Sequence, residues 1–388
     1  MEQSLQSWTT RELGKDPQDR SRLQPSKCHK RKITAVAWSP NGKRLASGCD
    51  GSTKNDPAQL IVWTLEQKGH GQESATMQMP DLHHARIAAL AWDPSGSRRL
   101  AVIDQKQTLK MLDTRSGDKQ QRVQLPGPNL RMAWSDQQGI IAVCSRANAV
   151  SFVSAASMKL LKTHPFDSSS PINEVNDVRW ADGGSLLLTA RGNGSVEVYS
   201  YPEMHRVNEL QAHVGPVLSM SITPNERYLA TAGDDACISV WDLQSLCCIR
   251  VLSGVDTPVP SVALSRDGQH LALALDDSNV AIYDVFTGQI EVQRECAQEA
   301  SAIKAGEAET YFPHVVAWNP QHSMLAYRGP YYDLSDQQQA RHLEREGGRN
   351  RHGPMSGFYP YGAHQPPPPA TLRIVPYGLV TLFSAPSQ

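Results

Sequence analysis

The sequence predicts an all-β fold, a propeller of seven four-stranded blades, and three observations lead to this fold class. One segment recurs along the chain, its apolar residues alternate with polar ones, and its copies lie about 42 residues apart. Alternation with a period of two indicates strands rather than helices. A repeat of about 40 to 45 residues is typical of one four-stranded propeller blade, so the 388 residues are expected to form a single propeller domain.

Each copy of the recurring segment contains two apolar runs that are joined by a turn rich in Pro, Asn, Asp and Gly. This arrangement is typical of an antiparallel hairpin. The clear copies are ITAVAWSPNGKRLASG at 33–48, IAALAWDPSGSRRLAV at 87–102, VNDVRWADGGSLLLTA at 175–190, VLSMSITPNERYLATA at 217–232 and VPSVALSRDGQHLALA at 259–274. Weaker copies begin at Leu130 and His314.

The apolar residue just before each turn serves as an anchor for counting the repeats. Successive anchors are 54, 42, 46, 42, 42 and 54 residues apart, so the base period is 42 and the longer spacings contain insertions. The anchors are Trp38, Trp92, Trp134, Trp180, Ile222, Leu264 and Trp318. Seven anchors predict seven blades.

A third strand follows each hairpin, and its equivalent position holds a large apolar residue. These residues are Trp63, Leu112, Val153, Tyr199, Trp241, Tyr283 and Phe383. At this position the chain resembles the WD-repeat family, whose name-giving dipeptide is present as Trp241-Asp242. In that family a His, a Ser or Thr, an Asp and the Trp form a hydrogen-bonded network within one blade. The resemblance implies such a network for His213, Thr231, Asp235 and Trp241 in blade five.

Other blades match this pattern less completely. Blade one offers His29, Ser47 and Trp63, and its acidic member is either Asp50 or Asp56 because the turn is longer. In blade two His83 is present, but Lys106 occupies the position of the Asp. We therefore expect apolar packing to hold blade two together.

The last blade is expected to close the ring with a strand from the N-terminal region. Residues near Arg20–Pro25 are the candidates for that strand, and the blade itself contains HVVAW at 314–318, MLAY at 324–327 and LVTLF at 379–383. An alternative register makes TLRIV at 371–375 a strand. The expected organisation is an N-terminal extension at 1–28, blades at 29–328, an insertion at 329–370, and the end of the last blade with a tail at 371–388.

The insertion at 329–370 is rich in Pro, Gly, Gln and Arg and is expected to be disordered. Aromatic residues in it are candidate partner contacts, although a plain linker is the simpler interpretation. A basic run before the first strand is a second candidate, and a solvated surface is its simpler interpretation. The candidate contacts are Lys30, Arg31, Lys32, Tyr331, Tyr332, Phe358, Tyr359 and Tyr361.

The sequence gives no indication of catalysis. It contains no catalytic, metal-binding or cofactor-binding signature, and the seven cysteines show no CxxC pair. No apolar run approaches the roughly 18 residues of a membrane span. The 38 Lys and Arg residues nearly balance the 39 Asp and Glu residues, so a strong attraction to nucleic acid is not expected. We expect a protein that is not an enzyme and has no cofactor, small-molecule substrate or membrane partner.

Several segments also resemble a narrower family, the third subunits of the THO complex. These are RGNGSVEVYSYPEM at 191–204, ANAVSFVSAAS at 147–157, ISVWDLQSLCCIR at 238–250 and HVVAWNPQHSMLAY at 314–327. The resemblance implies a nuclear scaffold whose partners are other THO subunits and mRNA export factors, with mostly indirect RNA contact. The alternative is an adaptor that recognises short peptides, as histone-binding or ubiquitin-ligase receptor propellers do.

Overall fold

A computed structural model describes most of the repeat region. The residues whose backbone it describes are 9–13, 29, 33–51, 58–65, 73–83, 85–96, 98–115, 121–167, 173–275, 279–295, 315–332 and 377–384. Side chains are not described for 9–13, 73–83, 279, 294–295, 328–332 and 377–384. Most of the expected insertion at 329–370 and the alternative strand at 371–375 lie outside these residues.

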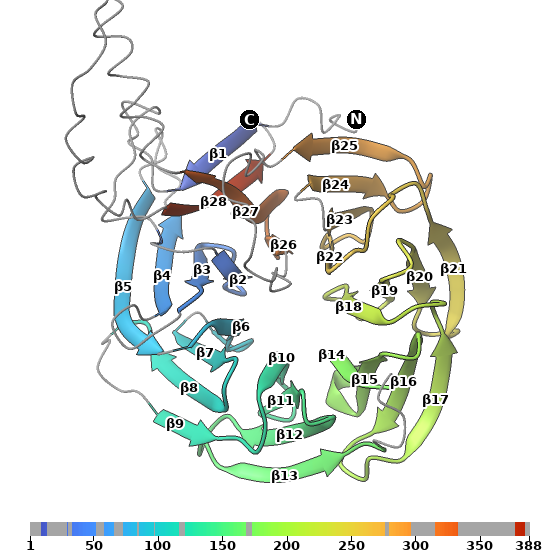
Figure 1. The fold of residues 1–388 in the computed structure, drawn as a ribbon, viewed down its shortest axis with the longest axis horizontal. Coiled ribbons are helices and arrows are strands. Elements are labelled where there is room, and N and C mark those ends of the chain that lie inside the picture. Colours follow the sequence, from blue (N-terminus) through green and yellow to red (C-terminus); the bar gives the residue numbers. More distant parts are fainter. Residues whose placement is uncertain are drawn as a thin grey trace, which may run out of the picture.

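Six blades are each formed by four consecutive antiparallel strands, with the first strand innermost (Figure 1). Blade one contains β2 (Ile33–Trp38), β3 (Arg44–Cys49), β4 (Ala58–Leu65) and β5 (Glu73–His83); blade two contains β6 (Ile87–Trp92), β7 (Arg99–Asp104), β8 (Thr108–Asp113) and β9 (Gln121–Gln124); blade three contains β10 (Asn129–Ser135), β11 (Ile140–Ser145), β12 (Ala149–Ser154) and β13 (Leu160–Pro165). Blade four contains β14 (Val175–Ala181), the short 3-10 helix η3 (Asp182–Gly184), β15 (Leu186–Arg191), β16 (Ser195–Ser200) and β17 (Arg206–Gln211). Blade five contains β18 (Val217–Ile222), β19 (Tyr228–Gly233), β20 (Ile238–Asp242) and β21 (Cys247–Leu252); blade six contains β22 (Ser261–Leu264), β23 (His270–Ala274), β24 (Asn279–Asp284) and β25 (Ile290–Glu295).

The prediction of a seven-bladed propeller was wrong, because the repeat forms only six blades of consecutive strands. The remaining four-stranded sheet is a composite with the order β1-β28-β27-β26. It combines β26 (Val316–Trp318), β27 (Met324–Tyr332) and β28 (Tyr377–Ser384) with β1 (Thr9–Leu13) from the other end of the chain. The seventh anchor, Trp318, lies in this composite sheet and does not begin a seventh blade of consecutive strands.

The closing strand is also not the one that the sequence indicates. Thr9 pairs with Ser384 and Leu13 pairs with Val380, so the described strand lies upstream of Arg20–Pro25. The prediction of Arg20–Pro25 was wrong because TTREL lacks the alternation that reveals a strand with a buried face. Strand β27 also extends to Tyr332, into the segment expected to be an insertion from 329.

Tryptophan anchors connect neighbouring inner strands. The Nε1 atom of Trp38 donates to the carbonyl oxygen of Ala317 at 3.0 Å, and that of Trp92 donates to Ala37 at 2.9 Å. Trp180 donates in the same way to the carbonyl of Ala133 at 3.1 Å. These three anchors are therefore used in packing against the preceding sheet, where a buried indole N–H needs an acceptor.

The junction between the composite sheet and blade one depends on a glycine. Gly42 has φ +68° in the turn between β2 and β3, and a Cβ there would lie 2.4 Å from Asn319 Oδ1. The amide of Asn319 instead donates to the carbonyl of Gly42 at 2.8 Å. A glycine is needed both for the left-handed conformation and for this close approach.

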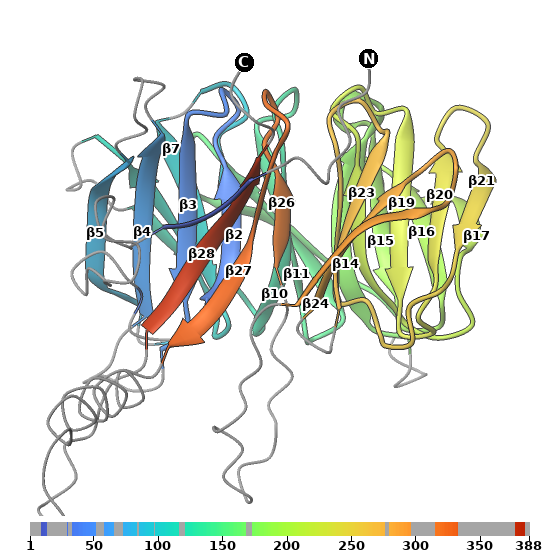
Figure 2. The same cartoon turned by 90° about the horizontal axis from the view of Figure 1, so that it is seen from above.

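Figure 2 shows the strands upright between two faces of the ring, so that turns emerge on both faces.

Candidate functional site

The four residues of the expected network in blade five lie together. The Nε2 atom of His213 lies 2.9 Å from Thr231 Oγ1, and its Nδ1 atom lies 2.9 Å from Asp235 Oδ1. Trp241 donates from Nε1 to Thr231 Oγ1 at 3.3 Å. Asp235 also accepts the backbone N–H groups of Val214 and Cys237. The network therefore joins the inner connection, the second strand, the turn and the third strand of one blade.

Blade one has a shorter version of this network. The Nε2 atom of His29 lies 2.7 Å from Ser47 Oγ, and Trp63 donates to the same oxygen at 2.9 Å. Burial lowers the pKa of His29 to about 3, so this imidazole is neutral. Asp50 accepts the N–H of Gly51. Of the two acidic candidates, Asp56 lies outside the described residues.

Blade four contains a buried ionic group that the sequence motif did not indicate. The Nε atom of Arg191 lies 3.2 Å from Glu197 Oε2, and both side chains are buried. Tyr199 donates to the same carboxylate oxygen at 2.8 Å, and the guanidinium lies over the Phe166 ring at 4.6 Å. Asn173 supplies two oxygens to Arg191. By strand register, Arg191 stands where blade five has Gly233, and Tyr199 stands where blade five has Trp241.

Blade two also uses a residue that sequence reasoning missed. The buried carboxylate of Asp104 accepts the backbone N–H groups of Lys106, Gln107 and Thr108 through Oδ1. An aspartate that bonds to the backbone beyond it is a strong turn former. The turn that carries Lys106 is therefore held by hydrogen bonds in addition to apolar packing.

One face of the ring carries the turns that follow the second strands and the connections that enter the inner strands; we call it the linker face. The two kinds of segment are bonded to each other in successive blades. The N–H groups of Gln105, Arg146, Gly192 and Asp234 donate to the carbonyls of Arg86, Pro128, Glu174 and Pro216, at 2.8 to 2.9 Å. These hydrogen bonds place side chains from distant parts of the sequence at equivalent positions around one opening.

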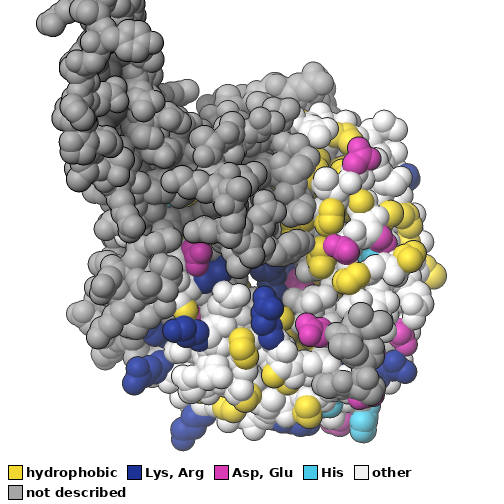
Figure 3. All heavy atoms as spheres, viewed as in Figure 1, with side chains coloured by type: hydrophobic (Ala, Val, Ile, Leu, Met, Phe, Trp, Pro, Cys, Tyr) yellow, Lys and Arg dark blue, Asp and Glu magenta, His cyan; other side chains and the backbone are white. Residues whose placement is uncertain are grey.

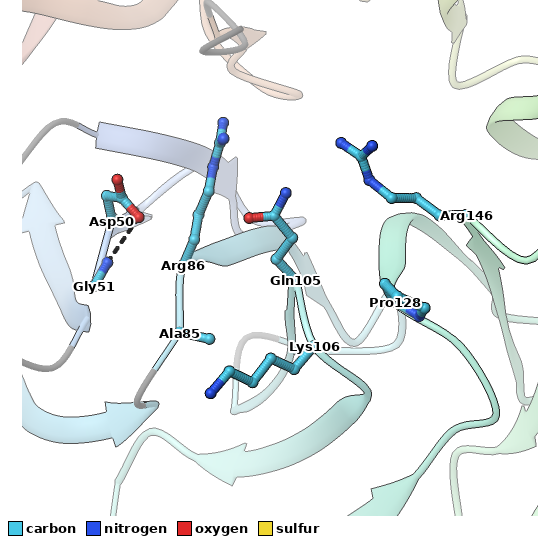
Figure 4. A pocket seen from close by; sticks show the side chains of 8 residues that line it. All are labelled: Asp50, Gly51, Ala85, Arg86, Gln105, Lys106, Pro128 and Arg146. Carbon is cyan, nitrogen blue, oxygen red and sulfur yellow. Dashed lines mark hydrogen bonds between the residues drawn. The ribbon is translucent and has the colours of Figure 1, made fainter. Parts of the chain in front are cut away.

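A pocket of about 400 Å³ lies on the linker face across blades one to three (Figure 4). Its lining residues are Asp50, Gly51, Ala85, Arg86, Gln105, Lys106, Pro128 and Arg146. Figure 4 shows the side chains of Arg86, Gln105 and Arg146 extending from separate turns toward the same side, with Lys106 below them. Three of the four charged side chains are cationic, so the pocket is suited to an anionic group.

The candidate partner contacts are mostly not placed by the structure. Lys30, Arg31, Lys32, Phe358, Tyr359 and Tyr361 lie outside the described residues. Tyr331 and Tyr332 are in β27, where their backbones pair with Gly378 and Tyr377. Their role in partner binding stays a prediction.

The described part of the chain contains neither of two further kinds of site, a membrane-spanning helix and a metal-binding cluster. None of its helices is long and apolar enough to span a bilayer. Among the same residues, no group of three or more His, Cys, Asp or Glu side chains is arranged to hold a metal ion.

Comparisons with known proteins agree with the repeat pattern. The family model for "WD domain, G-beta repeat" matches residues 21–54 and 204–242. THO complex subunit 3 of Arabidopsis thaliana is 28% identical over 301 residues, which are 78% of this chain and 87% of that protein. WD repeat-containing protein AAC3 of Dictyostelium discoideum is 25% identical over 244 residues, 57% of this chain and 48% of that protein. These matches confirm both resemblances found in the sequence.

A solved structure supports the fold. The β-propeller domain of Cps50 (Swd1) from Myceliophteria thermophila superimposes with a TM-score of 0.63 and covers 77% of this chain and 94% of that domain. The two sequences are 17% identical, so this similarity shows the propeller fold alone.

Proposed function

We propose that this chain, in which WD repeats are recognised and which folds as a β-propeller, is a non-catalytic scaffold subunit of a THO-type nuclear complex that couples transcription to mRNA packaging and export. The observation that carries this proposal is the similarity to THO complex subunit 3, which extends over 301 residues and 87% of that relative. Similarity over so much of one protein goes beyond a shared repeat. The partners would be other subunits of the complex and mRNA export factors, and RNA contact would be indirect.

The outer edge of the ring offers a surface for such partners. Large apolar side chains are exposed on outer strands of three successive blades: Leu161 in β13 is 54% exposed, Val207 in β17 is 56% exposed and Val251 in β21 is 59% exposed. Apolar side chains that gather at a surface often mark protein contacts. A rigid ring that contacts partners through its outer strands can hold them in a fixed relation without any chemistry of its own.

Affinity purification of the tagged full chain from nuclear extract, followed by crosslinking mass spectrometry, tests the proposal. We expect other THO subunits to be recovered, with crosslinks to the outer strands β13, β17 and β21. Recovery of the folded chain without any THO subunit or export factor would show that the proposal is wrong.

Single substitutions on the outer strands test where the partners bind. Leu161→Asp and Val251→Asp are each expected to lower recovery of the partners about fivefold, because each puts a charge into an apolar contact. Lys162→Asp is the matched control, since Lys162 is the exposed neighbour of Leu161 in β13. Equal losses from Leu161→Asp and Lys162→Asp would argue against an apolar contact at this strand.

A further inference from the structure

The charge at equivalent positions of the linker face changes sign around the ring. Blade two presents Arg86 and Lys106, and blade three presents Arg146. Blade four instead presents the exposed Glu174, and blade five presents the exposed Asp234. In the view of Figure 3, Lys and Arg side chains lie beside the central opening over blades two and three, whereas Asp and Glu side chains lie mainly over blades four to six.

The turns of blades two and three that carry these basic residues are held in a defined shape by hydrogen bonds. Asp104 fixes the turn that carries Lys106, and the N–H of Arg146 donates to the carbonyl of Pro128 at 2.9 Å. In the part of the chain that the structure describes, no ion pair is formed by Lys106 or by Arg146. Their charges therefore remain available to a ligand, on turns that do not need to be ordered when it binds.

We propose that the pocket between blades one and three binds an acidic segment of a partner protein, and that basic residues of the same segment reach Glu174 and Asp234. Carboxylates are suited to the cationic side, because a guanidinium binds a carboxylate through two parallel hydrogen bonds. The pocket volume of about 400 Å³ lies in the range that holds small chemical groups, so it would receive acidic side chains rather than a folded domain.

The acidic half of the face favours a polypeptide over RNA. RNA is negatively charged along its whole length, so a strand leaving the basic pocket across blades four and five would approach Glu174, Asp234 and the exposed Asp256. A polypeptide can carry both signs of charge. The lining of the pocket also contains no aromatic side chain on which a base would stack.

Binding of synthetic peptides to the full chain, measured by fluorescence anisotropy, tests the proposed site. One labelled peptide carries an acidic block and a basic block, and a second has the same composition with the two charges alternating. We expect the block peptide to bind about tenfold more tightly, and added salt to weaken it. Equal affinity for the two peptides would overturn the proposal.

Charge reversal locates the site. Lys106→Glu combined with Arg146→Glu is expected to weaken binding of the block peptide about tenfold. Lys159→Glu is the matched control. Lys159 is exposed and belongs to blade three, as Arg146 does, but it lies in the turn after β12, away from the linker face. A second double variant, Lys106→Gln with Arg146→Gln, removes the two positive charges without reversing them. Thermal melting followed by circular dichroism checks that this variant is folded. Unchanged affinity in both double variants would show that the site is elsewhere.

A single-stranded RNA oligonucleotide provides the competing outcome. If it displaces the block peptide and loses affinity in the same variants, the pocket is a general polyanion site and the peptide proposal is wrong. The partner in cells is taken from the proposed scaffold function, but the peptide assay does not depend on it. A chain that binds the block peptide yet recovers no THO subunit would keep the pocket and refute only the scaffold function.

Discussion

Arg191 and Glu197 form a buried ion pair inside blade four, with Nε 3.2 Å from Oε2 and 1% and 5% of the two residues exposed. By strand register, Arg191 and Glu197 stand where blade five has Gly233 and Ser239. Glu197 pairs with Thr189 as Ser239 pairs with Thr231 in blade five. Tyr199 follows two residues later, as Trp241 does. Blade four thus joins its second and third strands by charge where blade five uses neutral hydrogen bonds.

Removing only the carboxylate should destabilise the protein strongly. In Glu197→Ala the buried guanidinium of Arg191 loses its counter-charge, and we expect the free energy of unfolding to fall by about 3 kcal/mol. Arg191→Leu combined with Glu197→Leu removes both charges and should recover much of that loss. Chemical denaturation of the three proteins measures the coupling. Equal destabilisation by the single and double changes would mean that the charges do not interact.

The aspartate in the network of blade five should also contribute to stability. Asp235→Ala leaves His213 and two backbone N–H groups without their acceptor, so we expect a loss of about 1 to 3 kcal/mol. Asp234→Ala is the control, because Asp234 directly precedes Asp235 in the same turn and its side chain is exposed. Thermal melting compares the two. Similar midpoints for both variants would contradict a stabilising role for the network.

His29 should make stability depend on pH. Its pKa in the folded protein is about 3, whereas an unfolded His has a pKa near 6.5, so the unfolded chain binds the proton more tightly. The stability from burying the neutral imidazole is complete above pH 6.5 and is lost as the pH falls toward 3. Between pH 7.5 and 5 the loss is about 2 kcal/mol.

Denaturation at those two pH values measures this loss. His29→Gln keeps a polar side chain beside Ser47 but does not titrate. It should therefore lose about 2 kcal/mol less than the original protein over the same interval. An identical pH dependence in both proteins would assign the effect to other groups.

The sequence could predict the hairpins because each lies within one repeat. Trp38, the turn after it and β3 are all contained in residues 33–49, and the apolar alternation of both strands reflects burial of the blade faces. The network of blade five could be predicted for the same reason, since His213, Thr231, Asp235 and Trp241 each stand at the place that the family motif gives them.

The remaining features depend on contacts that a linear pattern does not contain. Arg191 and Glu197 are charged residues in a position where the motif expects none, and only the fold shows that both are buried. The basic pocket combines Arg86 and Arg146, which come together because the ring places consecutive blades side by side. The closing strand pairs through its backbone at the outer edge of a sheet that is built from both ends of the chain.

Removal of the closing strand should open the ring at the composite sheet. Deleting residues 1–13 exposes the unpaired backbone of β28 from Val380 to Ser384, which the register shows bonded to β1. We expect the melting midpoint to fall by about 5 °C or more, and the exposed edge to promote aggregation. Deleting residues 1–8 is the matched control, because it keeps Thr9–Leu13. Calorimetry and light scattering give the two readouts. If both truncated chains melt and scatter like the full chain, then β1 does not stabilise the ring, and closure must rest on contacts such as that of Trp38 with Ala317.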